Sequence, residues 1–322
     1  MKKIRNFIKC AYAAIFLLLA ASVLAQAEDI NELLDRAGRQ MYVQKYEEAL
    51  LTLQSALKID PNNFEALKYI GTAHSAVGNL KQARTFFERA YAIDPSGAEI
   101  NNNLGVSYST DGNREKAIEF FLKAVKVDSS SAIFNANLGM EYLRIGRTMG
   151  ALPYLHKANS IRPKQPEILF SIGNSYAAAS RIDSAEFYYE KSAEAGGAAA
   201  ELYYFLGRIK DKLKKTKDAE ASYKTALKLQ SNYPDCIRSL GILYITEGRY
   251  TEAAVQFENV LATDSSFPGN WVGLGTAYAL EGRSEKADSI FNGLYAVDTS
   301  LAFQMMRMIR EERSRQKEKA KD

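Results

Sequence analysis

Small and apolar residues recur along this chain with a period of 34 residues. Steps of 34 from Ala37 reach seven glycines: Gly71, Gly105, Gly139, Gly173, Gly207, Gly241 and Gly275. An alanine follows each of these eight positions twelve residues later: Ala49, Ala83, Ala117, Ala151, Ala185, Ala219, Ala253 and Ala287. A fixed period of this length is typical of an array of one structural unit that buries its apolar face by stacking on its neighbours.

Each unit contains the apolar spacing of two helices. With the ladder glycine as position 8, positions 4, 7, 8 and 11 share one helix face, and positions 20, 24 and 27 share another. Between them, five units have a turn glycine at position 15: Gly78, Gly112, Gly146, Gly248 and Gly282. We therefore predict eight helix-turn-helix units: 30–63, 64–97, 98–131, 132–165, 166–199, 200–233, 234–267 and 268–301.

Glycine at position 8 has a packing reason. A larger side chain would push two closely crossing helices apart, and a large residue at position 24 then fills the space beside the crossing. Six of the seven prolines fall at position 32 or position 1, where a helix ends or begins. Pro153 lies at position 22, inside a second helix, so we predict that this helix starts late or kinks there.

The unit resembles the tetratricopeptide repeat. The resemblance covers residues 30–301 and is clear in the last unit, which carries Trp271, Leu274, Gly275 and Tyr278 at positions 4, 7, 8 and 11. It implies an all-α fold, a right-handed α-solenoid superhelix of antiparallel helix pairs whose concave surface is lined by first helices. It also implies a scaffold or peptide-binding role. One departure is Lys210, which stands where the tyrosine of position 11 is expected.

The two ends of the chain differ from the repeats. Residues 1–27 combine a basic start, an apolar run over 11–24 and the small-residue site Ala25-Gln26-Ala27, the pattern of a secretory signal peptide. We expect cleavage near Ala27 and a periplasmic or secreted protein; an uncleaved membrane anchor stays open as an alternative. Residues 302–322 are expected to form a capping helix, rich in methionine as far as Ile309, followed by a charged tail that frays.

Export changes the charge balance. The whole chain has a formal net charge of +4. Removing the four basic residues of the leader leaves 38 basic and 38 acidic residues, so the composition gives no reason to expect nucleic-acid binding. Cys236 is the one cysteine outside the leader, which excludes an intramolecular disulfide in the mature chain.

Candidate chemistry is sparse. His74 occupies position 11, where a core aromatic is expected, and His156 occupies position 25, where we expect a solvated side chain. Neither histidine has metal-ligand spacing with Cys236. We expect no enzyme activity, no catalytic residue, no metal site and no cofactor.

The other face of the first helices offers a surface for binding. Positions 5, 9 and 12 share this face by three- and four-residue spacing. In the later units they form a bed of aromatic and aliphatic residues with two arginines: Met140, Leu143, Phe170, Asn174, Tyr204, Arg208, Arg238, Ile242 and Ile245. This composition suits an extended or helical peptide. Local packing between neighbouring first helices is the alternative.

A basic cluster lies at residues 208–217, where six cations face a single acid, Asp211. Its candidate residues for an anionic contact are Lys210, Lys212, Lys214, Lys215 and Lys217. An acidic peptide, a membrane surface or a cell-wall polymer would supply that contact, whereas a solvated helix end is the alternative.

The function that these observations favour is a non-catalytic scaffold. It would bind a partner protein or peptide, whose identity the sequence does not give, in its concave groove in the cell envelope. The alternative is a structural assembly or bridging factor that self-associates through the ends of the superhelix. The methionine-rich final helix motivates that alternative.

Overall fold

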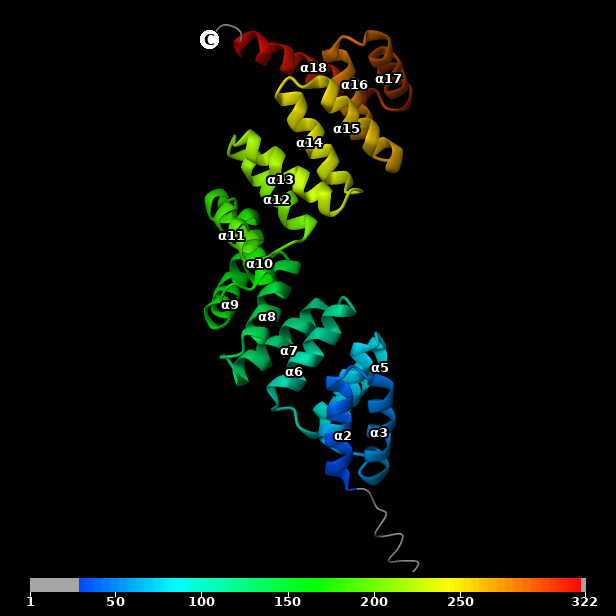
Figure 1. Cartoon of the computed structure of the whole chain (residues 1–322), viewed down its shortest axis with the longest axis vertical. Coiled ribbons are helices and arrows are strands. Elements are labelled where there is room, and N and C mark those ends of the chain that lie inside the picture. Colours follow the sequence, from blue (N-terminus) through cyan, green and yellow to red (C-terminus); the bar gives the residue numbers. More distant parts are fainter. Residues whose placement is uncertain (1–28, 320–322) are drawn as a thin grey trace, which may run out of the picture. The chain divides into compact units, whose positions relative to one another are not determined.

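The structure is a computed structural model that describes residues 29–319. Helices joined by short turns make up this part of the chain (Figure 1). Within these residues there are 17 helices and no strand. The expected signal peptide lies outside the described residues. The chain divides into two compact units, residues 1–141 and 142–322.

The first unit contains α2 to α7, and α8 runs across the division. Their bounds are α2 Ile30–Tyr42, α3 Tyr46–Ile59, α4 Phe64–Ala76, α5 Leu80–Ile93, α6 Ala98–Thr110, α7 Arg114–Val127 and α8 Ala132–Arg144. Consecutive helices pack on one another from α2 to α7. Asn63 is the N-cap of α4, and its side chain accepts a 3.0 Å hydrogen bond from the backbone N–H of Ala66.

The second unit contains α9 to α18. Their bounds are α9 Thr148–Ile161, α10 Pro166–Ala178, α11 Ile182–Glu194, α12 Ala200–Lys212, α13 Thr216–Leu229, α14 Pro234–Thr246, α15 Tyr250–Thr263, α16 Pro268–Glu281, α17 Ser284–Val297 and α18 Thr299–Lys319. Consecutive helices again pack on one another. This sequential packing of helix on helix makes the fold an all-α solenoid of helical repeats.

Five ladder glycines lie against aromatic rings: Gly71, Gly105, Gly173, Gly207 and Gly241. A Cβ atom built on Gly71 would stand 2.5 Å from the ring of Phe87, at position 24 of the same unit, and one on Gly173 would stand 2.5 Å from the ring of Tyr189. In the first repeat, residues 30–63, Ala37 stands in place of the ladder glycine and Leu53 stands in place of the aromatic residue. Ala37 and Leu53 are both fully buried. Leucine is smaller than an aromatic residue and so leaves room for the methyl group of Ala37.

The turn between the two helices of a unit requires a left-handed backbone. Gly78 and Gly248 adopt φ angles of 81° and 76° there. Where glycine is missing, Lys214 takes the same conformation at φ 61°. A side chain in this region costs about 1 kcal/mol relative to glycine, so the turn between α12 and α13 is strained.

The expected late start of the helix around Pro153 is wrong. α9 begins at Thr148 and includes Pro153 in its interior. Pro153 is exposed, and so is Met149, whose carbonyl would have accepted the missing N–H. Water can therefore replace the lost hydrogen bond, which removes the reason for a late start.

The final helix is longer than the sequence suggested. We expected a fraying tail from Arg310, but α18 continues to Lys319. Glu312 is 2% exposed and accepts hydrogen bonds from Gln316 at 2.6 Å and Arg315 at 2.8 Å. These pairs, three and four residues apart, hold the polar half helical. Met305 is buried against Gly275 of α16, so this methionine serves packing within the chain.

Candidate functional site

A cavity of about 310 Å³ opens on the first helices α10 and α12 of the second unit. We name it the α10–α12 cavity, and its lining consists of Asn174, Ala177, Ala178, Tyr189, Phe205, Arg208, Ile209 and Lys212. Two predicted groove residues, Asn174 and Arg208, thus meet Lys212 from the predicted basic cluster. The two alanines leave the space open because they carry only a methyl group.

Arg208 reaches the cavity across two aromatic rings. Its guanidinium carbon lies 5.6 Å from the ring centroid of Tyr204 and 5.9 Å from that of Phe205, within cation–π range. No ion pair joins Arg208 or Lys212 to an acidic side chain anywhere in residues 29–319. The cavity therefore holds two positive charges without a negative counterpart from the chain.

Asn174 is oriented by a buried tyrosine. Its Oδ1 atom accepts a 2.7 Å hydrogen bond from the hydroxyl of Tyr189, a residue with no exposed surface. Burial raises the pKa of the Tyr189 hydroxyl, so that group stays a neutral donor. This bond orients the side chain of Asn174, whose amide nitrogen is a donor available for further bonding.

Aromatic rings surround this cavity. The ring centroids of Phe170 and Phe205 lie 6.0 Å apart, and those of Tyr204 and Phe205 lie 5.3 Å apart. Phe170 also approaches Tyr189, at 5.7 Å. The structure thus brings four predicted groove residues, Phe170, Asn174, Tyr204 and Arg208, into one neighbourhood of rings, an amide and a cation.

The other predicted groove residues do not join this neighbourhood. Met140 and Leu143 are half-buried on α8, and Met140 belongs to the first unit. Ile242 is exposed on α14. Ile245 was wrongly placed on a binding surface: it is 4% exposed and shares an apolar cluster with Ala277 and Ile309, so this side of α14 is covered.

Arg238 lies on α14 and is already partnered. Its Nη1 atom is 2.7 Å from Oδ1 of Asp235, and its Nε atom donates to Oδ1 of Asn270 at 3.0 Å. The guanidinium carbon also lies 4.1 Å from the ring centroid of Phe267. An incoming anion would have to compete with these contacts.

Two of the six cations of the predicted basic cluster pair with acids of the preceding repeat. Lys210 pairs with Glu190 at 3.1 Å, and Lys215 pairs with Glu186 at 2.7 Å. An anionic ligand would therefore have to compete with these two carboxylates for Lys210 and Lys215. The count along the sequence missed the acids because they lie about one unit earlier in the chain. Lys214 and Lys217 remain exposed.

Sequence signals for the unpredicted cavity residues were weak. Tyr189 and Ile209 belong to buried faces, and nothing in their spacing shows that they border a cavity. The run Ala177-Ala178-Ala179 was the available signal, since small residues stand there where a helix surface commonly carries larger side chains.

Comparison with known proteins identifies the family. The tetratricopeptide repeat family matches residues 34–98 in one form, and residues 98–131 and 200–233 in another. The chain is a tetratricopeptide repeat protein. Proteins of this family generally act as non-catalytic scaffolds, and no catalytic family is indicated. No curated protein matches the chain.

Solved structures of other tetratricopeptide repeat proteins share the fold. PilF of Pseudomonas aeruginosa aligns with a TM-score of 0.58 and 20% identity over 64% of this chain and 94% of its own. PilW, a type IV pilus biogenesis factor, gives 0.56 and 24% over 64% and 94%. YrrB, which has an unusual peptide-binding site, gives 0.53 and 25% over 58% and 97%.

The histidines of this tetratricopeptide repeat protein serve packing. His74 stacks on Phe86 with ring centroids 5.6 Å apart. His156, expected to be solvated, is half-buried: its Nε2 atom lies 3.1 Å from the hydroxyl of Tyr176. Burial lowers the pKa of both imidazoles. Position 25 faces position 11 of the next repeat, which explains the error. Cys236 is a buried free thiol, and within residues 29–319 no acid, histidine and cysteine cluster could hold a metal.

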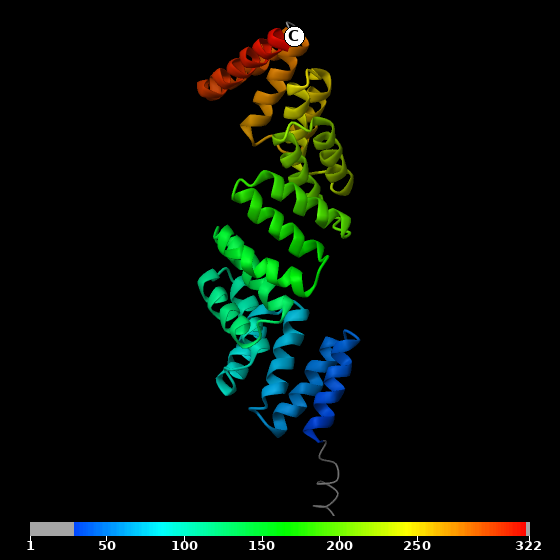
Figure 2. The same cartoon turned by 90° about the vertical axis from the view of Figure 1, so that its left-hand side faces the viewer.

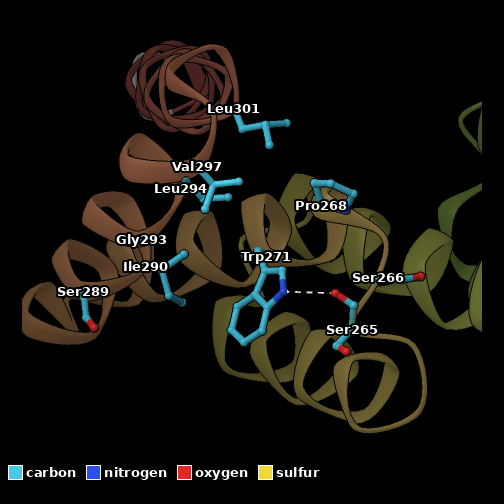
Figure 3. Close-up of a pocket in the computed structure, with 10 residues that line it drawn as sticks. All are labelled: Ser265, Ser266, Pro268, Trp271, Ser289, Ile290, Gly293, Leu294, Val297 and Leu301. Carbon is cyan, nitrogen blue, oxygen red and sulfur yellow. Dashed lines mark hydrogen bonds between the residues drawn. The ribbon is translucent and has the colours of Figure 1, made fainter.

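A second hollow, of about 450 Å³, lies between α16, α17, the start of α18 and the loop that precedes α16. Figure 3 shows Trp271, Ile290 and Leu294 around it, with the indole nitrogen of Trp271 directed at the carbonyl of Ser265, 3.4 Å away. None of its ten lining residues is charged. Gly293 adds no side chain to this hollow, and a Cβ built at its position would meet nothing within 4 Å.

The corresponding hollow of the repeat at 166–199 is lined by charged side chains. Lys191 occupies the position of Gly293; its Nζ atom lies 5.7 Å from the ring centroid of Phe187 and 2.9 Å from a carboxylate oxygen of Glu194. The last repeat thus differs from the repeat at 166–199 because Gly293 stands where the earlier repeat has the cationic side chain of Lys191. Nothing in the structure shows what covers the open apolar hollow.

Proposed function

We propose that this protein binds an acidic, partly apolar segment of a partner protein at the α10–α12 cavity. The observation that carries this proposal is the pair Arg208 and Lys212, which line an aromatic-walled cavity without acidic partners. A carboxylate of the partner would approach the guanidinium of Arg208. An adjoining apolar side chain would pack against Phe205.

The geometry suits a peptide more than a small molecule. The cavity is open along the first helices, and rings extend beyond it to Phe170 and Tyr204. The guanidinium of Arg208 contacts two rings, which restricts its motion and lowers the entropy lost when it binds an anion. The similar YrrB is a tetratricopeptide repeat protein with a peptide-binding site, which supports a peptide as the ligand class.

Selection from a random peptide library tests this function. We expect enrichment of Asp or Glu next to an aromatic or aliphatic residue, and we expect Arg208→Glu to abolish the enrichment. Lys217→Glu is the matched control, because it makes the same charge change on exposed α13, outside the cavity. An enriched motif without acids, or one that Arg208→Glu leaves unchanged, would contradict the proposal.

We also propose that the protein acts in the cell envelope after export. The support is the basic, apolar and small-residue order of residues 1–27. Among residues 29–319, none of the helices has the length and apolar character required to cross a membrane. Mass spectrometry of the protein from its native host tests this: an N-terminus at Glu28 is expected, and a chain that retains residues 1–27 in the cytoplasm would contradict it.

A further inference from the structure

The last helix, α18, carries two parallel stripes of side chains with different environments. One stripe is buried or half-buried against the second unit and consists of Ala302, Met305, Ile309, Glu312 and Gln316. The neighbouring stripe, displaced by one residue, is exposed and consists of Phe303, Met306, Arg310, Arg313 and Lys317. Both alternate steps of three and four residues, which aligns each set along one side of a helix.

The exposed stripe begins apolar and continues basic. Phe303 is 61% exposed and Met306 is 45% exposed, both unusually open for large apolar side chains. One turn further on, Arg310, Arg313 and Lys317 have no ion-pair partner in residues 29–319. Figure 2 shows α18 as a long helix at the end of the second unit, with one side away from the neighbouring helices.

The acids of α18 lie off this stripe. Glu311 is 3.9 Å from Arg307, and Glu312 is buried and bonded to Arg315. Glu318, the remaining acid, is one residue beyond Lys317, about 100° around the helix. The stripe therefore presents unneutralised positive charge beside exposed apolar side chains, although the mature chain as a whole is balanced in charge.

We propose that this outer stripe of α18 binds an anionic lipid surface. Charge complementarity selects the partner, because three cations without ion-pair partners in residues 29–319 lie along the exposed side of α18. The apolar side chains favour a lipid surface over an acidic protein as the partner. Phe303 and Met306 can enter the boundary between headgroups and acyl chains while the cations contact phosphates. A second copy of the chain is disfavoured, since two basic stripes would repel each other.

The edge of the apolar part is shaped for shallow insertion. The rings of Phe303 and Tyr295 meet edge to face, with centroids 6.4 Å apart, and Tyr295 is itself half-exposed. Val297, at the end of α17, is 86% exposed. The buried stripe anchors α18 to α16 through Met305, so only the outer side chains enter the lipid and the helix need not detach.

Flotation with lipid vesicles tests this proposal. The protein, purified in the form that its host produces, is mixed with vesicles of phosphatidylcholine alone or of phosphatidylcholine with phosphatidylglycerol. We expect binding to the anionic vesicles only, and weaker binding as salt is raised. The variant Arg310→Glu with Arg313→Glu and Lys317→Glu should lower the partition coefficient by about a hundredfold or more. Phe303→Ser should lower it by about tenfold.

The matched control reverses three exposed cations elsewhere on the surface, Lys58, Lys126 and Lys228. It should bind like the unchanged protein, and circular dichroism should show that all variants keep their helices. Equal binding to neutral and anionic vesicles, no binding to either, or an equal loss in the control variant would overturn the proposal. Binding of polyglutamate through the α18 cations, without vesicle binding, would also overturn it and assign the stripe to an acidic protein.

Discussion

Arg208 and Arg238 lie on the first helices of consecutive repeats, and both cover aromatic rings, but their surroundings differ. Arg238 is bonded to Asp235 and Asn270 and contacts Phe267. Arg208 has rings beneath it and no acidic partner. The sequence placed both in the binding groove for the same reason. The difference teaches that the neighbours of a groove residue, more than its type, decide whether it is available to a ligand.

The physical consequence is a division between stability and binding. Removing a paired arginine leaves its partner's charge and hydrogen bonds uncompensated, so such a substitution acts on the stability of the fold. An unpaired arginine above aromatic rings keeps its attraction for an anion and is preorganised for it. We therefore expect substitutions in the α12 region to change affinity and those in the α14 region to change unfolding.

The largest expected effect is on peptide affinity. Arg208→Glu should weaken binding of a selected acidic peptide by about a hundredfold, since it replaces the attracting charge with a repelling one. Arg238→Gln should change the same affinity by less than about threefold, because Arg238 is already partnered. Isothermal titration calorimetry measures both. Similar losses for the two variants would remove the distinction between the two arginines.

Filling the α10–α12 cavity should have the next largest effect on peptide affinity. Ala178→Leu places a larger side chain in the lining and should lower peptide affinity by about tenfold through steric exclusion. Ala221→Leu, on the exposed surface of α13, is the matched control and should leave affinity unchanged. Unaltered binding by the Ala178 variant would mean that the ligand does not enter this cavity.

A third arginine extends the comparison to pH. Arg249 bonds Glu220 at 2.6 Å and lowers the pKa of that carboxyl from 4.5 to about 2. A depressed pKa gives stability that is present above the ordinary pKa and is lost as pH falls toward about 2. Arg249→Gln should cost about 2 kcal/mol at neutral pH and flatten the decline of stability between pH 4.5 and 2.

Thermal unfolding followed by circular dichroism at several pH values checks this prediction. Arg208→Gln is the control, because Arg208 has no acid to stabilise, and it should keep the original pH profile. An Arg249 variant with an unchanged acid profile would show that the pair with Glu220 does not contribute.

The smallest expected effect is at the strained turn beside the cavity. Lys214 occupies a left-handed conformation that glycine adopts in five other units. Lys214→Gly should raise stability by about 0.5–1 kcal/mol and leave peptide affinity unchanged, since Lys214 does not line the cavity. Chemical denaturation measures the first effect. A loss of stability would mean that the side chain makes a contact worth more than the strain.

The fold could be predicted because each unit repeats the same steric demand. In five units the glycine at position 8 faces a ring at position 24, as Gly71 does with Phe87, so period and composition both report one contact. Pro153 misled because a proline's effect depends on whether water reaches the freed carbonyl, which exposure decides and sequence does not.

The candidate site could be predicted only in part. Phe170, Asn174, Tyr204 and Arg208 follow from helix spacing. The ion pair of Lys210 could not be predicted, because its partner Glu190 belongs to the preceding repeat and the local charge count omitted it. Ile245 failed since the helices that cover it lie later in the chain. Contacts between repeats are thus what a per-unit pattern leaves out.

Photocrosslinking in the native host tests the central claim most directly. A photoreactive residue replaces Ala178 in the cavity or, as control, Ala221 on α13, and the crosslinked peptide is sequenced. We predict one protein partner, joined through a segment that contains Asp or Glu beside an apolar residue, from the cavity position only. This crosslink should disappear with Arg208→Glu. The same crosslinks from both positions, or a crosslink that persists with Arg208→Glu, would contradict the account.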